Sequence, residues 1–229
     1  MNTLTIGARG PEVIFLQRLL NKRGAAPYLT EDGIFGPATH RALTAFQHSE
    51  HLPTPHGSAV PATWQRLGTL SERLHAVTPF AQPSNMSCWS AAATIILGNR
   101  SVGSGPAQTD ATGGLRIDLA NVEAYVRSLG WRIVNNQTQP PASQLVATVM
   151  RGPAWVAFQG LHFAHAVVFS GVYTDGAQDG TGTVFRVHDP WPPGHGTGSM
   201  YGTTYLGHTV WLRSTGHPQP AMIAYVAQR

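Results

Sequence analysis

The chain has 229 residues, of which 42% are hydrophobic and only 11% are charged, and it contains 25 glycines and 17 prolines. Recurrent aromatic and branched apolar residues exclude a disordered chain and indicate a loop-rich globular protein, and no apolar run reaches the roughly 18 to 20 residues of a membrane span. The formal net charge of +4 comes from scattered basic residues without a cluster or nucleotide-binding motif, so we expect no binding to nucleic acid.

The first 70 residues are predicted to form three short helices. Apolar residues at helical spacing indicate a helix over residues 11–20, with Gly24 as its stop signal. A second helical pattern covers residues 39–46, and a proline opens a third over 61–67. Because a small helical module has to bury its few large side chains, its core is expected to contain Leu16, Phe35, Phe46 and Trp64.

A specific motif lies at the turn before the second of these helices. Residues 32–39 read Asp-Gly-Ile-Phe-Gly-Pro-Ala-Thr, and a Leu-Gln and a Phe-Gln pair stand on the helices before and after the turn. Over residues 4–67 this pattern resembles the three-helix peptidoglycan-binding domain, a wall-targeting module that usually accompanies a wall-degrading catalytic domain. With this resemblance, exposed polar groups of the turn, here Asp32 and Thr39, are expected to contact peptidoglycan, and capping of the turn by the same groups is the alternative. Gly33 and Gly36 are expected to adopt positive φ there.

The chain is expected to divide near residues 68–78, where its pattern changes. We predict a peptidoglycan-binding module at 1–70, a linker at 71–78 and a second domain at 79–229. Helices of the second domain are predicted at 88–97, 117–129 and 143–150, and strands at 154–158, 164–172, 182–188, 209–212 and 222–226. Helices followed by an antiparallel sheet indicate an α+β fold.

Cys88, the only cysteine, stands where a loop meets the apolar helix predicted at 88–97. One cysteine excludes an intramolecular disulfide and a cysteine-based zinc site. A lone cysteine is more often a small buried hydrophobe than a nucleophile. At a helix start, however, the unpaired N–H groups and the positive end of the dipole favour a thiolate. Gln82, six residues upstream, offers a side-chain amide to the same place.

Further along the chain stand His165, which precedes an apolar strand, and Asp189, which begins the run Asp-Pro-Trp. The ordered series Gln82, Cys88-Trp89, His165 and Asp189 resembles the papain-like cysteine peptidases, most closely the bacterial papain-like and bacteriocin-processing groups. The resemblance implies a papain-like domain, with helices packed on an antiparallel sheet.

Acyl transfer assigns a role to each residue of this series. Cys88 is the expected nucleophile, His165 its acid and base, and Asp189 the group that orients the imidazole. Gln82 and the backbone N–H of Cys88 are expected to form the oxyanion hole. The tryptophans that follow the cysteine and the aspartate, Trp89 and Trp191, are expected to line the substrate cleft.

Other interpretations of these positions remain open. His162 is a rival base, and with His165 it could form a metal pair, although no third ligand is evident. His165 is preferred because it directly precedes the strand. Asp189 could merely cap the turn before Pro190, and His188 should point to the opposite face of its strand. No metal and no cofactor are predicted.

Together the two regions predict a peptidoglycan hydrolase that cleaves an amide bond of the stem peptide or cross-link. The N-terminus lacks the features of a secretory signal, so we expect delivery by lysis or by a secretion machine. The favoured version is an antibacterial effector acting in a rival cell's periplasm, with peptidoglycan, an immunity protein and a secretion-machine component as partners. The chain is expected to be a monomer. A papain-like protein endopeptidase and a non-catalytic wall-binding protein are the alternatives.

Overall fold

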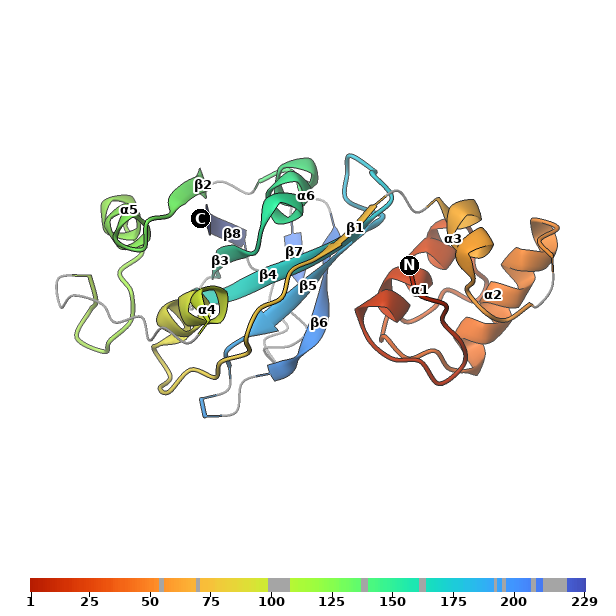
Figure 1. Cartoon of the computed structure of the whole chain (residues 1–229), viewed down its shortest axis with the longest axis horizontal. Helices are drawn as coiled ribbons and strands as arrows, with labels where there is room; N and C mark the ends of the chain where they lie inside the picture. The colour runs from red at the N-terminus through yellow and green to blue at the C-terminus, as the bar shows by residue number, and fades with distance from the viewer. Residues whose placement is uncertain are drawn as a thin grey trace.

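The computed structural model describes residues 1–53, 56–68, 71–98, 108–136, 140–160, 164–191, 193–194, 197–206, 209–211 and 222–229. Over these residues the fold is α+β, as predicted, with a small helical module at one end of the molecule and a larger sheet-containing domain at the other (Figure 1). No helix in the described ranges is both long and apolar enough to span a bilayer.

The N-terminal module consists of α1 (Pro11–Lys22), α2 (Pro37–Ser49) and α3 (Pro61–Leu67), each with a proline in its first turn. The predicted core is confirmed, since the four large side chains named from the sequence are all buried, with exposures of 0 to 8%. Gly33 takes a φ of 73°, as expected. The prediction for Gly36 is wrong: its φ is −93°, because it is the N-cap of α2 and has the extended backbone that this position requires.

The described part of the second domain contains the helices α4 (Cys88–Leu97), α5 (Leu119–Ser128) and α6 (Ala142–Arg151). The strands in the described ranges are β1 (Ser71–Leu74), β2 (Arg132–Asn136), β3 (Ala154–Gln159), β4 (Ala164–Thr174), β5 (Thr183–Asp189), β6 (Thr197–Leu206), β7 (Thr209–Trp211) and β8 (Met222–Gln228). They form one antiparallel sheet in the order β2-β8-β3-β4-β5-β6-β7, and β1 pairs with β4 outside this path.

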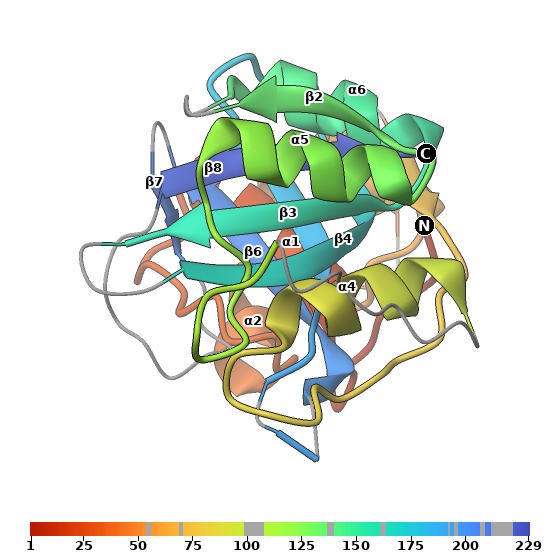
Figure 2. The same ribbon diagram turned by 90° about the vertical axis from the view of Figure 1, so that its left-hand side faces the viewer.

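Helices cover both faces of this sheet (Figure 2). Successive side chains of β4 point to opposite faces of the sheet. Val167 and Phe169 pack with α6, whereas Ala166 and Val168 pack with α4 and α5. Apolar residues on α4, α5 and the sheet surround the buried Trp155. The start of α4 therefore rests on the centre of the sheet, next to the strand that carries His165.

The segment predicted as a linker is part of the sheet. Residues 71–74 form β1, and the half-buried Arg186 donates hydrogen bonds to the carbonyl of His75 and to Ser170. This strand was not foreseen because its residues Ser-Glu-Arg-Leu are mostly polar and gain strand structure by pairing with β4. The connection between the two domains is consequently fixed rather than loose.

The helical module also packs directly on the sheet, at the ends of β4 and β5 that lie far from α4 and α5 (Figure 1). Tyr173 and Val184 belong to the same buried cluster as the core of the module, and the Tyr173 hydroxyl donates to Glu12 Oε1 at 2.8 Å. Arg18, only 4% exposed, bonds Glu31 and donates to the carbonyl of Thr183 at 3.2 Å. One hydrophobic core thus runs through the domain boundary.

Candidate active site

Cys88 is the first residue of α4 and lines a cleft of about 450 Å³. Its thiol is half-buried, and the helix behind it is almost wholly apolar. Local sequence explains this start: the Ser87 hydroxyl bonds the carbonyl of Ser84 and closes a turn just before the helix. The nucleophile candidate therefore sits at the N-terminal end of a buried helix.

His165 and Asp189 meet at the end of the strands that carry them. Nε2 of His165 lies 2.7 Å from Oδ1 of Asp189, whose side chain is 1% exposed. The same oxygen accepts the backbone N–H of Trp191 at 2.9 Å, so the carboxylate is held in place from two sides. Strands β4 and β5 are neighbours in the sheet, which is why two residues 24 positions apart can pair.

The imidazole of His165 and Cys88 line the same cleft, and Cys88 is near enough to act on the pKa of the ring. Since Nε2 is committed to Asp189, Nδ1 is the ring nitrogen left for the thiol. Burial alone would lower the pKa of His165, but the hydrogen bonds and charges of Asp189 and Cys88 outweigh it and raise the pKa to about 10. The imidazole is therefore protonated at neutral pH and places a positive charge beside Cys88 in the cleft.

Gln82 lies beside this group but does not line the cleft. Its backbone bonds the carbonyl of Pro190 and the N–H of Gly194, which ties it to the loop after Asp189. The side chain is fully buried, its Nε2 donates to the carbonyl of Ser84 at 2.6 Å, and its Oε1 makes no hydrogen bond with the described residues. An oxyanion-hole role requires the amide, or its second N–H, to turn toward Cys88.

The walls of the cleft are mainly apolar. Trp89 and Trp191, expected there from the sequence, both line it, and the Trp89 indole donates to the carbonyl of Gly113 at 3.2 Å. Deeper parts of the wall come from buried side chains of α5, β3, β4 and β8, namely Val122, Trp155, Ala157, Ala166 and Tyr225. Asp110 and Arg116 add opposite charges at exposed positions of the lining.

Two other histidines were weighed for this site. His162 lies outside the described residues. His188 pairs across the sheet with Val168, on the face covered by α4, and is only 6% exposed. Burial and the charge of Arg186 lower the pKa of His188 to about 4, so it is neutral where His165 is protonated. Among the described residues, no three His, Cys, Asp or Glu side chains are grouped to hold a metal ion.

Asp32 and Thr39 belong to the distant helical module and do not approach the cleft. The side-chain amide of Gln17 bonds Asp32 Oδ1 at 2.8 Å and Thr39 Oγ1 at 3.1 Å. Thr39 is 2% exposed, which argues against direct contact with a ligand, whereas Asp32 is exposed. In this structure both residues hold the turn together.

Sequence patterns did not point to several residues that surround Cys88. Tyr125 and Trp155 bond the backbone next to it, and the N–H of Trp191 fixes Asp189. Both aromatic side chains sit in ordinary apolar runs, so no local signal distinguished them from core residues. Their relation to Cys88 exists only after α5 and β3 pack against α4.

Two family models match the chain. Residues 9–67 match the family described as a putative peptidoglycan binding domain, and residues 74–202 match the family described as Papain-like cysteine protease AvrRpt2. The predicted fusion is thereby confirmed. A comparison with curated proteins finds no match.

The solved structures that share similarity with part of the chain include a phage endolysin and a SleB domain. The crystal structure of Burkholderia AP3 phage endolysin is 43% identical over 29% of this chain, with a TM-score of 0.27. The match covers 25% of the endolysin, so the chain aligns with about a quarter of that protein. The SleB N-terminal domain is 38% identical over 29% of this chain and 88% of its own, also with a TM-score of 0.27.

Proposed function

Because the chain belongs to the papain-like cysteine proteases of the AvrRpt2 family and carries a peptidoglycan-binding domain, we propose that it hydrolyses an amide bond in the stem peptide or cross-link of peptidoglycan. The observation that supports the chemistry best is the hydrogen bond between His165 and Asp189, with His165 and Cys88 lining the same cleft. The N-terminal module supports the choice of substrate, since it concentrates the enzyme on the polymer.

Acylation begins when the Cys88 thiolate attacks the amide carbonyl carbon, forming a carbon–sulfur bond and an oxyanion. The raised pKa of His165 keeps a proton on the ring, and its N–H facing the thiol donates that proton to the departing amine nitrogen. The carbon–nitrogen bond then breaks, leaving a thioester on Cys88 and a neutral imidazole. Asp189 holds the ring in orientation throughout.

Deacylation reverses these roles. Neutral His165 takes a proton from water, whose oxygen attacks the thioester carbon, and the carbon–sulfur bond breaks to restore the thiolate and imidazolium. The products are one carboxylic acid and one amine for each water consumed. The backbone N–H of Cys88 supports the oxyanion in both steps, with Gln82 as the second donor once its amide leaves Ser84.

A second candidate function is cleavage of a protein, and the cleft gives a specific reason to consider it. Its deep walls of Trp155, Val122 and Tyr225 suit a bulky apolar side chain. Stem peptides are built mainly from alanine, glutamate and a diamino acid, which offer little of that kind. The helical module would then serve only to localise a peptidase.

We further infer that the enzyme acts as an antibacterial effector in the periplasm of a rival cell. A wall-cleaving enzyme endangers its producer, so an immunity protein that blocks the cleft and a secretion-machine component that loads the enzyme are the expected partners. Expression in the cytoplasm and, with an added leader, in the periplasm of the same bacterium tests this role. Lysis is expected only from the periplasm, and equal tolerance in both compartments would contradict it.

Digestion of purified peptidoglycan tests the enzymatic proposal. Wild type is expected to release new muropeptides that mass analysis identifies as an amine and a carboxylic acid, and Cys88→Ala to release none. Glu123→Gln, an exposed position on α5, is the matched control and should act like wild type. Casein cleavage with unchanged muropeptides would favour the protein endopeptidase, and inactivity on both would favour a wall-binding protein.

A further inference from the structure

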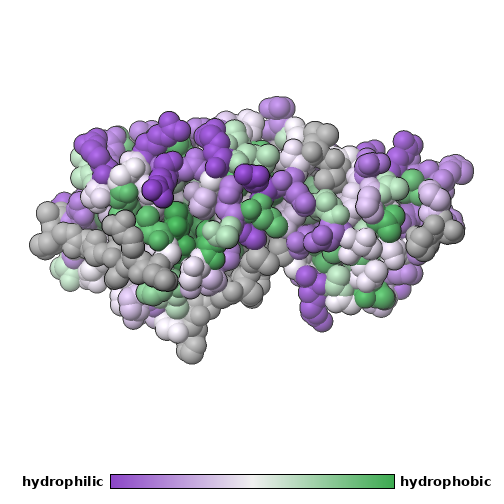
Figure 3. All heavy atoms as spheres, viewed as in Figure 1, coloured by the Kyte–Doolittle hydropathy of each residue, from purple (hydrophilic) through white to green (hydrophobic). Residues whose placement is uncertain are grey.

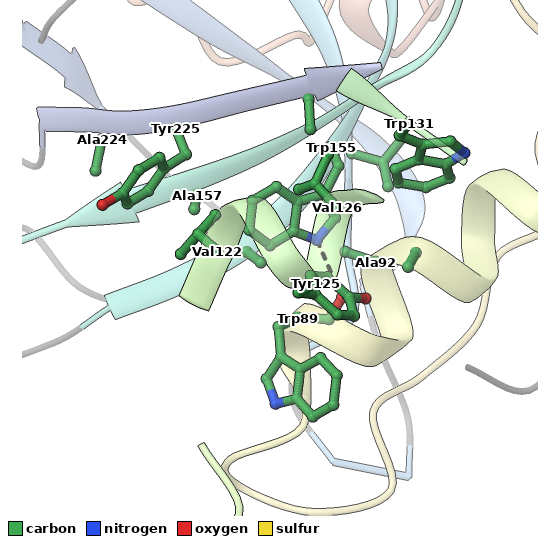
Figure 4. Close-up of a cluster of buried hydrophobic side chains, with 14 of the residues drawn as sticks. Trp89, Ala92, Val122, Tyr125, Val126, Trp131, Trp155, Ala157, Ala224 and Tyr225 are labelled. Atoms are coloured by element: carbon green, nitrogen blue, oxygen red, sulfur yellow. Dashed lines mark hydrogen bonds between the residues drawn. The ribbon is translucent and has the colours of Figure 1, made fainter. Parts of the chain in front are cut away.

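One backbone carbonyl beside Cys88 receives more hydrogen bonds than its place in a helix requires. The carbonyl of Trp89, in the first turn of α4, accepts the Tyr125 hydroxyl at 3.2 Å and the Trp155 indole N–H at 3.0 Å (Figure 4). A helical carbonyl ordinarily accepts one N–H, four residues further on. Both external donors come from side chains that are only 1% exposed, and they reach the carbonyl from α5 and from β3.

The bond from Trp155 links the first turn of α4, where Cys88 lies, to the sheet that carries His165. Trp155 stands on β3 opposite Val168 of β4, and three residues further along the same pairing places Phe158 opposite His165. The strand that holds the start of α4 is thus hydrogen-bonded to the strand that carries the imidazole. Tyr125, on α5, adds a second bond to the same carbonyl, and its ring lies edge-on to that of Trp89 at a centroid distance of 5.1 Å.

We propose that Tyr125 and Trp155 are positioning residues, which hold the first turn of α4 through the Trp89 carbonyl so that Cys88 keeps its place beside His165 in the cleft. This inference rests on the proposed function, because it concerns the reaction of that thiol. A displacement of about 1 Å at a reacting group can cost on the order of 10²-fold in rate, so a hold on the helix start matters more than its bond energy suggests.

A purely structural role for the two bonds would require that the Trp89 carbonyl have no other hydrogen-bond donor. The carbonyl is already paired within the helix, so satisfying a buried acceptor does not require two further donors. Burial, with a smaller contribution from the charge of Cys88, raises the pKa of Tyr125, so the hydroxyl stays protonated and can only donate to this acceptor.

The test compares two tyrosine-to-phenylalanine variants. Tyr125→Phe removes one hold on the Trp89 carbonyl and keeps the ring. Tyr173→Phe is the matched control, since it also removes the hydrogen bond of a tyrosine that is 1% exposed, but at the domain boundary far from the cleft. Trp155→Phe is the second variant, to be judged by thiol reactivity because Trp155 lines the cleft.

Two measurements are made on the full chain: alkylation of Cys88 by iodoacetamide from pH 5 to 10, which needs no substrate, and kcat and KM on dye-labelled peptidoglycan. We expect Tyr125→Phe to lower kcat and the alkylation rate at pH 6 about tenfold, with KM unchanged, and Trp155→Phe to lower the alkylation rate similarly. Tyr173→Phe should leave kcat and the alkylation rate unchanged, even if its melting temperature falls as much as that of Tyr125→Phe.

Each remaining outcome has a definite meaning. If Tyr125→Phe matches Tyr173→Phe in both measurements while wild type is active, the positioning role is wrong and the proposed function stands. If wild-type Cys88 reacts at pH 6 no faster than a free cysteine, the proposed function fails and the positioning role falls with it.

Discussion

The shared core at the domain boundary predicts that a single buried arginine of the wall-binding module stabilises the whole molecule. Arg18→Ala removes a guanidinium that is 4% exposed and that bonds both the Glu31 carboxylate and the carbonyl of Thr183 on β5. The Glu31 side chain is only 12% exposed and keeps a long bond, 3.4 Å, from Asn21. Removing one partner of a buried ion pair costs about 3 to 5 kcal/mol, and because Glu31 keeps other partners, Asn21 among them, we expect a loss of about 3 kcal/mol.

Urea unfolding, followed both by tryptophan fluorescence and by retained activity, measures this loss. Arg66→Ala is the matched control: its pair with Glu50 lies within the module, the Arg66 side chain is 59% exposed, and the expected loss is below about 1 kcal/mol. The two probes should give one coincident transition in wild type, because β1, Tyr173 and Val184 join the module to the sheet. Two separate transitions, or equal losses in the two variants, would refute the shared core.

Three further predictions concern the site and the linker. Asp189→Asn removes the charged hydrogen-bond partner that contributes most to raising the pKa of His165 to about 10, so the alkaline limb of the kcat/KM profile should move to lower pH. An unmoved limb would contradict the pairing of His165 with Asp189. Burial and the charge of Arg186 lower the pKa of His188 to about 4, so its contribution to folding is present above pH 6.5 and is lost as pH falls toward 4. His188→Leu should therefore reduce the loss of unfolding free energy over that pH range. An equally steep loss in the variant would contradict the prediction. Gly171→Ala would place a Cβ 2.8 Å from the Arg73 carbonyl and 2.5 Å from the Leu74 side chain. The unfolding free energy should therefore fall by about 1 to 3 kcal/mol, and proteolysis within residues 68–78 should become faster. Unchanged protection of these residues from proteolysis would contradict the pairing of β1 with β4.

Sequence predicted those elements best that carry their own start and stop signals. The bounds of α3 and α4 match the predicted helices, because Pro61 opens one and Gly98 ends the other. Strands β1 and β6 were not predicted, since one is polar and the other is rich in glycine, serine and threonine, and each owes its structure to a partner strand. A local sequence pattern does not predict a strand whose formation depends on pairing with another strand.

The same distinction applies to the candidate site. Cys88, His165 and Asp189 were identifiable because each stands at a recognisable place, a helix start or a strand end, and the structure brings the three together. The orientation of the Gln82 amide depends on the carbonyl of Ser84, which no spacing rule includes. The bonds from Tyr125 and Trp155 to Trp89 arise from three elements that are distant in sequence.

Hydrolysis of peptidoglycan in water enriched in ¹⁸O tests the central claim most directly. Purified peptidoglycan is digested by wild type and by Cys88→Ala, and the soluble fragments are weighed by mass spectrometry. Nucleophilic catalysis by Cys88 predicts that each cleaved amide yields one free amine and one carboxylic acid carrying a single ¹⁸O, and that the variant yields neither. Unaltered muropeptides from wild type, or the same labelled fragments from Cys88→Ala, would contradict it.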